Sequence, residues 1–121
     1  MLPELFEVRM KALLGAEYDE FLAAYDRPRN VGLRLNPLKT KDFPSLEEFS
    51  LTPVPWAKYG YTYDPATRPG LHPWHEAGLY YLQEPSAMAP VYLLDPQPGK
   101  KVCDLCAAPG GKTTQIAGRM G

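Results

Sequence analysis

The sequence lacks several features that would identify whole classes of protein. Its 121 residues carry a formal net charge of −1, so no overall basic excess points to nucleic acid. Only two cysteines are present, Cys103 and Cys106, which excludes the disulfide framework of a small secreted domain. No apolar run is long enough for a transmembrane helix, and no basic-then-apolar signal segment opens the chain. We therefore expect a globular, cytoplasmic protein without a membrane partner.

Positive charge is concentrated in one stretch of the chain. Five basic residues and no acidic residue lie in this stretch: Arg27, Arg29, Arg34, Lys39 and Lys41. A basic strip can follow a phosphate backbone, although a solvated surface explains the same pattern.

Apolar spacing predicts a series of short elements joined by proline-rich turns. Two amphipathic helices open the chain, with Gly15 as the C-terminal cap of the first. Val31, Leu33 and Leu35 then alternate with less apolar residues, which predicts a half-buried strand. The later expected elements are a short helix with a Ser45 and Glu48 capping box carrying Leu46 and Phe49, an aromatic strand containing Trp56, Tyr59, Tyr61 and Tyr63, a linker over 64–75, an extended segment over 79–83, a helix over 85–94, a buried strand over 101–105 and a helix over 112–120.

The stretch that follows the last predicted strand carries the clearest chemical signal. Small residues fill positions 107–111, and Gly110 and Gly111 allow the backbone to approach a ligand closely. A helix then begins at Lys112, and its free amides favour an anionic or electron-rich group. This order of strand, small-residue loop and helix is typical of a nucleotide-like cofactor pocket in an α/β sheet.

A phosphate-binding loop is the main alternative for this stretch. Gly111, Lys112 and Thr113 match the end of G-x-x-x-x-G-K-[ST], but the first glycine of that motif falls at Cys106. Pro109 also removes one of the amides that such a loop directs at phosphates. The match therefore fails at two positions that the mechanism needs.

Three segments resemble the Sun/Nol/Nop family of RNA (cytosine-5) methyltransferases, and the resemblance covers nearly the whole chain. The first cofactor motif of that family is similar to Asp104-Leu105-Cys106-Ala107-Ala108-Pro109-Gly110-Gly111-Lys112-Thr113. The segment leading into its methyltransferase domain resembles Gln83-Glu84-Pro85-Ser86-Ala87-Met88. A strand of its RNA-facing region resembles Gly32-Leu33-Arg34-Leu35-Asn36-Pro37-Leu38-Lys39. The continuation over 113–116 looks most like the bacterial branch that acts on small-subunit ribosomal RNA.

The resemblance implies that the cofactor is S-adenosyl-L-methionine. The residues it places in the cofactor loop are Cys106, Ala107, Ala108, Pro109, Gly110, Gly111 and Lys112. Asp104 is expected near the amino-acid end of the cofactor, and Arg34 and Lys39 are the candidate RNA contacts. Family members methylate C5 of cytosine through a covalent cysteine adduct, on bases that are accessible or flipped out of structured RNA.

The catalytic cysteines of that family lie in motifs downstream of the cofactor loop. No position in the 121 residues matches them, and Cys106 matches the loop cysteine, so we assign no catalytic residue. We expect the isolated chain not to turn over. Ribosomal RNA is the expected substrate of the parent enzyme, with transfer RNA as an alternative. A non-catalytic RNA-binding protein and a nucleotide-binding protein with a phosphate loop are further alternatives.

Two other groups of residues could carry chemistry. Cys103 and Cys106 form a Cys-x-x-Cys, and with His72 and His75 they could make a zinc site; the cysteine pair could alternatively be redox-active. Cys103, however, lies in the predicted buried strand, where free cysteine usually packs as a small apolar residue, so we expect no metal. The four aromatic residues of the predicted strand over 56–63 could stack RNA bases, but packing explains them more simply.

The expected fold class is an α+β N-terminal region followed by the first strand, loop and helix of an α/β class I (Rossmann-like) methyltransferase domain. We expect residues 1–70 to form the RNA-facing region. Residues 71–121 would then hold a connector and the start of the cofactor-binding domain.

Overall fold

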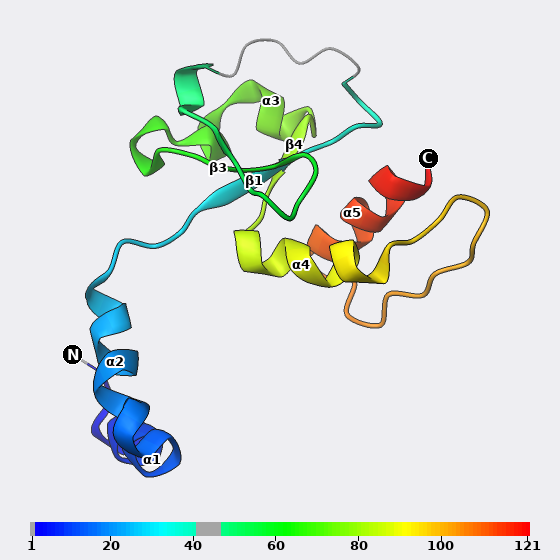
Figure 1. The fold of residues 1–121 in the computed structure, drawn as a ribbon. Helices are drawn as coiled ribbons and strands as arrows, with labels where there is room; N and C mark the ends of the chain where they lie inside the picture. The colour runs from blue at the N-terminus through cyan, green and yellow to red at the C-terminus, as the bar shows by residue number, and fades with distance from the viewer. Residues whose placement is uncertain (1, 41–46) are drawn as a thin grey trace.

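The computed structural model describes residues 2–40 and 47–121, which form one small sheet and several helices (Figure 1). None of the helices within these described residues is long and apolar enough to cross a bilayer. In chain order the elements are α1 (Glu4–Leu14), α2 (Tyr18–Ala23), β1 (Gly32–Leu35), β2 (Thr52–Pro53), β3 (Gly60–Thr62), α3 (Pro73–Glu76), β4 (Tyr80–Leu82), α4 (Pro85–Leu94) and α5 (Gly111–Met120), with short 3-10 turns between several of them.

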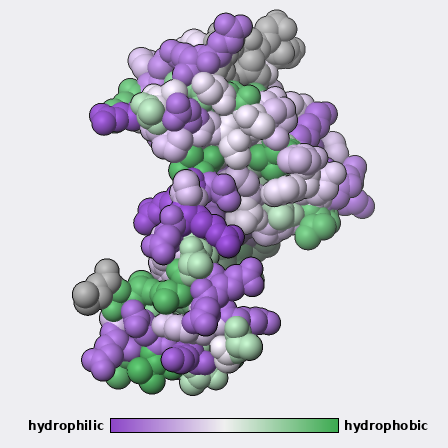
Figure 2. Space-filling view, turned by 60° about the vertical axis from the view of Figure 1, so that its left-hand side comes forward, coloured by the Kyte–Doolittle hydropathy of each residue, from purple (hydrophilic) through white to green (hydrophobic). Residues whose placement is uncertain are grey.

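Both helices predicted at the start of the chain are confirmed, but the apolar residues Leu5, Val8 and Leu13 of the first helix are exposed and form no buried face. Gly15 ends α1 with a positive φ of 53°, a conformation that favours glycine. Aromatic contacts connect the helices, with the rings of Phe6 and Phe21 6.3 Å apart. Helix α1 has no buried residue, and α2 has only Tyr18. Figure 1 shows the pair standing away from the sheet, and Figure 2 shows hydrophobic and hydrophilic residues interspersed on its surface.

The sheet is antiparallel throughout, with the strand order β2-β3-β1-β4. Strand β1 is therefore paired on both edges, opposite β3 on one side and β4 on the other. The predicted strand is confirmed, but its predicted half-burial is wrong, because all four residues of β1 are buried. Leu33 and Leu35 enter the main core with Phe49 and Tyr80. Arg34 points to the opposite face, where α5 covers it.

The region between β2 and β4 is more ordered than a linker. Residues 64–75 were predicted to be one, but they form two 3-10 turns and lead into α3. Pro69 is buried in the second turn, and its carbonyl accepts a hydrogen bond of 2.7 Å from the Tyr80 hydroxyl. Of the four aromatic residues predicted in one strand, only Tyr61 lies in β3. Tyr59 lies in the preceding turn with a φ of 73°.

The predicted short helix near residue 48 is seen only in part. A 3-10 turn spans Glu47–Phe49, and Phe49 is buried in the core. Ser45 and Leu46 lie outside the described residues, as does Lys41 of the basic strip. The capping box that Ser45 would make therefore stays a prediction.

Helix α4 confirms the helix predicted over 85–94 and connects the sheet to the C-terminal segment. Pro85 occupies its first turn, where a missing amide hydrogen is tolerated. Pro90 lies within the helix without ending it, and Asp95 closes it in the left-handed conformation. Met88 is fully buried beneath the turn before β3, in a cluster with Val54 and Ala57. Helix α4 also packs along α5.

The strand predicted over 101–105 is wrong. Among the described residues, none of the four strands pairs with this segment, which has no regular secondary structure. Leu105 is 91% exposed, and Val102 and Cys103 are exposed as well. Apolar residues form a buried strand only where a neighbouring strand accepts their backbone hydrogen bonds, and these residues have none. The helix predicted after this segment is confirmed as α5, with Gly121 at its C-terminal cap.

Candidate functional site

Asp104 organises the loop that precedes α5. One carboxylate oxygen, Oδ1, accepts a hydrogen bond from the Cys106 amide at 3.0 Å. The other, Oδ2, accepts one from the Thr113 hydroxyl at 2.7 Å. The bond from Thr113 lowers the pKa of Asp104 most, followed by the bond from Cys106, so the carboxylate is the favoured form. Asp104 thus fastens the start of the loop to the first turn of the helix.

The end of the loop presents backbone to solvent. Gly110 caps α5 with a φ of 112°, a conformation that side chains disfavour, and it provides no side-chain cap. The Thr114 hydroxyl donates to the Gly110 carbonyl at 2.8 Å. Residues 105–109 are exposed, and the Ala108–Pro109 peptide bond is cis. The first turn of the helix therefore carries amides without intrahelical partners at an accessible position.

Arg34 is buried against this loop, whereas the sequence suggested a phosphate contact on the surface. Only 4% of the residue is exposed to solvent. Its Nε donates to Gln83 Oε1 at 2.9 Å, and one terminal nitrogen donates to the Gly111 carbonyl at 3.1 Å and to Thr114 Oγ1 at 2.7 Å. The guanidinium is thus engaged inside the protein. Lys39 is exposed, and its Nζ donates to the Ala77 carbonyl at 2.6 Å. Arg34 and Lys39 therefore contact different parts of the protein, and the structure does not bring them together.

Two glutamines, Gln83 and Gln115, extend the polar contacts of Arg34, and both are buried. Gln83 Nε2 donates to the Ala87 carbonyl at 3.0 Å and to Gln115 Oε1 at 3.4 Å. Gln115 Nε2 in turn donates to the Met88 carbonyl at 3.0 Å. Sequence reasoning missed this network, because Gln83 and Gln115 stood out only as members of resembling segments and nothing in the sequence indicated that they are buried together.

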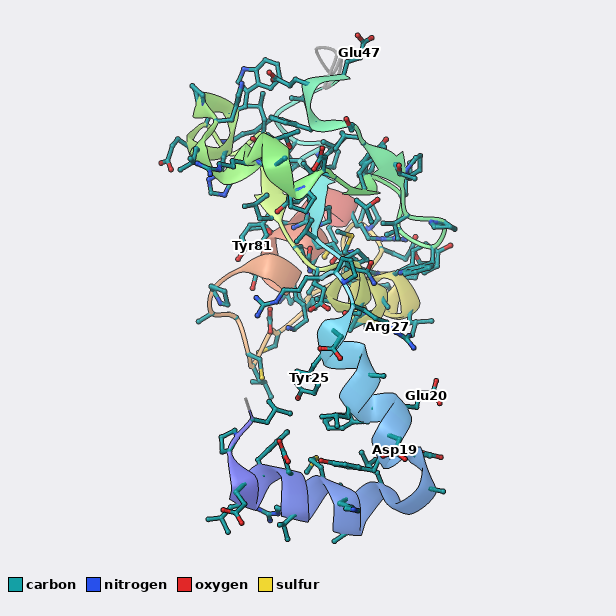
Figure 3. All side chains as sticks on the ribbon, turned by 90° about the vertical axis from the view of Figure 1, so that its left-hand side faces the viewer. Asp19, Glu20, Tyr25, Arg27, Glu47 and Tyr81 are labelled. Carbon is teal, nitrogen blue, oxygen red and sulfur yellow. The ribbon has the colours of Figure 1, made fainter. Side chains whose placement is uncertain are left out.

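Tyr81 supplies a second contact between the sheet and the loop. Its hydroxyl donates to the Pro109 carbonyl at 3.2 Å, and its ring centroid lies 5.9 Å from the Arg34 guanidinium carbon. Arg34 and Tyr81 are cross-strand partners of β1 and β4, which places their side chains on one face of the sheet. Figure 3 shows Tyr81 beside the start of α5.

The structure does not assemble the possible zinc site. Across residues 2–40 and 47–121, no three His, Cys, Asp or Glu side chains converge as metal ligands. Both cysteines are exposed, so the expectation that Cys103 is buried is wrong. His72 instead packs between aromatic rings, 4.6 Å from Trp74 and 5.4 Å from Phe49.

A shallow groove of about 350 Å³ runs beside the loop, between α4, α5 and residues 102–106. Asp104, Cys106 and Lys112 line it together with apolar residues of both helices. Three of the predicted cofactor residues therefore share one surface.

Comparison with known proteins identifies relatives over the whole chain. A family model described as the N-terminal domain of 16S rRNA methyltransferase RsmF matches residues 2–85, and one described as 16S rRNA methyltransferase RsmB/F matches residues 91–121. Ribosomal RNA small subunit methyltransferase F of Klebsiella pneumoniae (strain 342) is 44% identical over 98% of the chain, which spans 28% of that relative. The protein of the same name from Escherichia coli O1:K1 / APEC is 40% identical, and the chain spans 27% of it.

A solved structure supports the same conclusion. The crystal structure of a methyltransferase homologue from Pyrococcus horikoshii superposes with a TM-score of 0.72 at 35% identity. The match covers 98% of this chain and 41% of that one. These findings confirm the resemblance that the sequence motifs indicated. The chain belongs to the family of the 16S rRNA methyltransferase RsmF N-terminal domain, and its last residues match the RsmB/F methyltransferase family.

Proposed function

We propose that this chain supplies the N-terminal part of an S-adenosyl-L-methionine-dependent methyltransferase that forms 5-methylcytosine in small-subunit ribosomal RNA. The chain spans less than a third of the curated relatives that carry the ribosomal RNA methyltransferase name. The activity of a whole relative is therefore an inference for this chain. Its support is the agreement between those names and the loop that precedes α5.

The observation that carries the proposal is the accessible backbone of residues 106–110. A Cβ placed on Gly110 would have only Thr114 Cγ2 within 4.0 Å, so no side chain obstructs that position. The loop is held by Asp104 at one end and by the helix at the other. An accessible backbone surface of this kind suits the binding of a cofactor. The residues proposed to hold the cofactor are Cys106, Ala107, Ala108, Pro109, Gly110, Gly111 and Lys112.

Asp104 is proposed to lie near the amino-acid end of the cofactor. Its two oxygens already accept hydrogen bonds from Cys106 and Thr113, and each retains a lone pair for a further donor. The bound cofactor would supply the methyl group. The chain's own residues would bind and orient it, while nucleophilic attack on the cytosine belongs to motifs that match no position in the 121 residues.

The finer architecture and the partners belong to the same proposal. Residues 101–121 would open a Rossmann-like domain, and the division of the chain near residue 70 stays a prediction. Lys39 remains the candidate RNA contact, because it is exposed and Arg34 is not. Ribosomal RNA is the proposed substrate, and a cytoplasmic location follows from it.

Isothermal titration calorimetry tests the proposal. The full chain is titrated separately with S-adenosylmethionine, with its demethylated product and with ATP. We expect the first two to bind and ATP not to bind. Gly110→Ala should weaken cofactor binding by about tenfold, because a side chain strains the positive-φ backbone at the loop. Gly99→Ala is the matched control, since Gly99 has a φ of 80° and open space but lies outside the loop.

Two outcomes would contradict the proposal. ATP binding that collapses in Lys112→Ala would favour the phosphate-loop reading. Binding of RNA without any affinity for S-adenosylmethionine or its product would favour a non-catalytic RNA-binding protein.

A further inference from the structure

We propose that Arg34 is a positioning residue that holds the cofactor loop against the central strand of the N-terminal sheet. The expected effect on cofactor affinity rests on the proposed function. The hold of Arg34 on the loop rests only on the contacts of Arg34. Arg34 would act through the loop and would not touch the cofactor itself.

The first step is the way the sheet aims Arg34. Strand β1 is central, and its neighbours β3 and β4 hold the backbone of Arg34 opposite Gly60 and Tyr81. Gln83, just past the end of β4, then accepts a hydrogen bond from the guanidinium Nε. Because a guanidinium is planar, fixing Nε also fixes the direction of the two terminal nitrogens. The strand pairing and Gln83 therefore fix the direction of the Arg34 side chain toward the loop.

The second step is the set of hydrogen bonds that the sheet residues donate to the loop. One terminal nitrogen of Arg34 donates both to the Gly111 carbonyl and to the Thr114 hydroxyl, in the first turn of α5. Tyr81 reaches the Pro109 carbonyl from the neighbouring strand. Two adjacent strands thus hold the loop at Pro109 and Gly111, on either side of the cap residue Gly110.

Close packing at Gly111 shows how tightly the loop lies on the sheet. A Cβ at Gly111 would lie 3.4 Å from Gln83 Nε2 and 3.4 Å from Tyr81 Cε1. These distances are ordinary van der Waals contacts, so the backbone at Gly111 lies directly against the two side chains. A side chain larger than that of alanine would push the loop away from the sheet.

The third step is the charge. Arg34 forms no salt bridge within the part of the chain that the structure describes, and its acceptors are a carbonyl, a hydroxyl and an amide oxygen. Burial lowers the pKa of Arg34 to about 10, which still leaves the group charged at neutral pH. A buried cation held by neutral acceptors is costly to displace, since removing any acceptor leaves a charged donor unpaired. This favours a single position of the loop.

The experiment compares Arg34→Met, Arg34→Lys and the wild-type full chain. Hydrogen exchange of the amides over 104–115 reports the loop, and titration with S-adenosylhomocysteine reports cofactor affinity. We expect Arg34→Met to speed exchange in these amides and to raise the dissociation constant at least tenfold. Arg34→Lys retains the charge without the planar fork, so it should recover part of both effects.

Lys58→Met is the matched control, because Lys58 is an exposed cation in the turn before β3 and only approaches the ring of Tyr59. It should change neither readout. If Arg34→Met fails to fold, Thr114→Val removes one acceptor of Arg34, together with the hydrogen bond from Thr114 to the Gly110 carbonyl, at nearly constant shape. It should shift both readouts in the same direction by a smaller amount, and Thr114→Ser, which retains the hydroxyl, should restore them.

The outcomes separate the two proposals. Wild-type exchange and affinity in a folded Arg34→Met, or in Thr114→Val where that variant replaces it, would overturn the positioning role. So would faster exchange with an unchanged dissociation constant, because Arg34 would then stabilise the fold without affecting the site. If the wild type does not bind S-adenosylhomocysteine, the proposed function fails. Hydrogen exchange still tests the positioning role in that case, because unchanged exchange in the variants would show that Arg34 does not hold the loop.

Discussion

The sheet around β1 and the loop that leads into α5 are stabilised in different ways. Leu33 at the centre of the sheet is fully buried, and its strand is hydrogen-bonded on both edges. Leu105 in the loop segment is 91% exposed, and the carboxylate of Asp104 supplies the main contacts there. Burial specifies the first region, whereas a few polar contacts specify the second. Substitutions in the sheet should thus change global stability, and substitutions in the loop should change local order.

The largest effect is expected from a cavity in the sheet. Leu33→Ala removes a fully buried side chain from the main core and should lower the free energy of unfolding by about 4 kcal/mol. Urea unfolding followed by circular dichroism measures the change. Leu71→Ala, at a residue 79% exposed, should cost less than about 0.5 kcal/mol. Similar losses in the two variants would mean that β1 is not the centre of the core.

A smaller but still global effect is expected from overpacking the same strand. A Cβ on Gly32 would lie 2.6 Å from the Gln83 carbonyl oxygen, which is backbone and cannot rotate away. Gly32→Ala should therefore cost about 3 kcal/mol in the same unfolding measurement. Unchanged stability would show that β1 and the chain after β4 can separate at little cost.

The junction between the two regions should give an intermediate effect. Gln83→Leu leaves Arg34 Nε without its acceptor and removes two donated hydrogen bonds, so we expect a loss of about 2 kcal/mol. Gln97→Leu is the control, since Gln97 is exposed and, within residues 2–40 and 47–121, its side chain donates only to Asp95. Equal stability of the two variants in thermal unfolding would contradict a junction built on Gln83.

The smallest effect concerns the titration of Asp104. Because its pKa is lowered in the folded protein, its hydrogen bonds stabilise the loop at neutral pH. That contribution is fully present above the unfolded pKa and is lost as the pH falls through the lower folded value. Thr113→Val should move the pKa upward toward its ordinary value, whereas Thr113→Ser should not. An NMR titration of the carboxyl carbon distinguishes these results, and an unchanged pKa in Thr113→Val would exclude the hydroxyl as its main cause.

Local patterns predicted the elements that the spacing of their own apolar residues or a proline in the first turn marks. The spacing of apolar residues located α1, α2 and β1, and Pro85 marked the first turn of α4. The loop of small residues before α5 was also visible in the sequence.

Contacts between distant segments were not predictable in this way. The alternation around Arg34 suggested an exposed side chain, because the helix that buries it begins 77 residues later in the chain. The apolar run over 101–105 suggested a strand, but a strand requires a partner that its own residues do not specify. Gln83 and Gln115 are 32 residues apart, and neither has a local signal that predicts burial.

The neutral acceptors of Arg34 have a consequence for the ionic strength at which this protein can be studied. Dissolved salt screens exposed charges over about 10 Å at 0.1 M, but it has little access to a buried guanidinium. Among the described residues, Arg34 also has no carboxylate partner with which dissolved anions would compete. The hold of the sheet on the loop should therefore persist at salt concentrations that weaken contacts between lysines and phosphates. Raising the salt concentration would separate recognition of a nucleic acid from the internal order of the site.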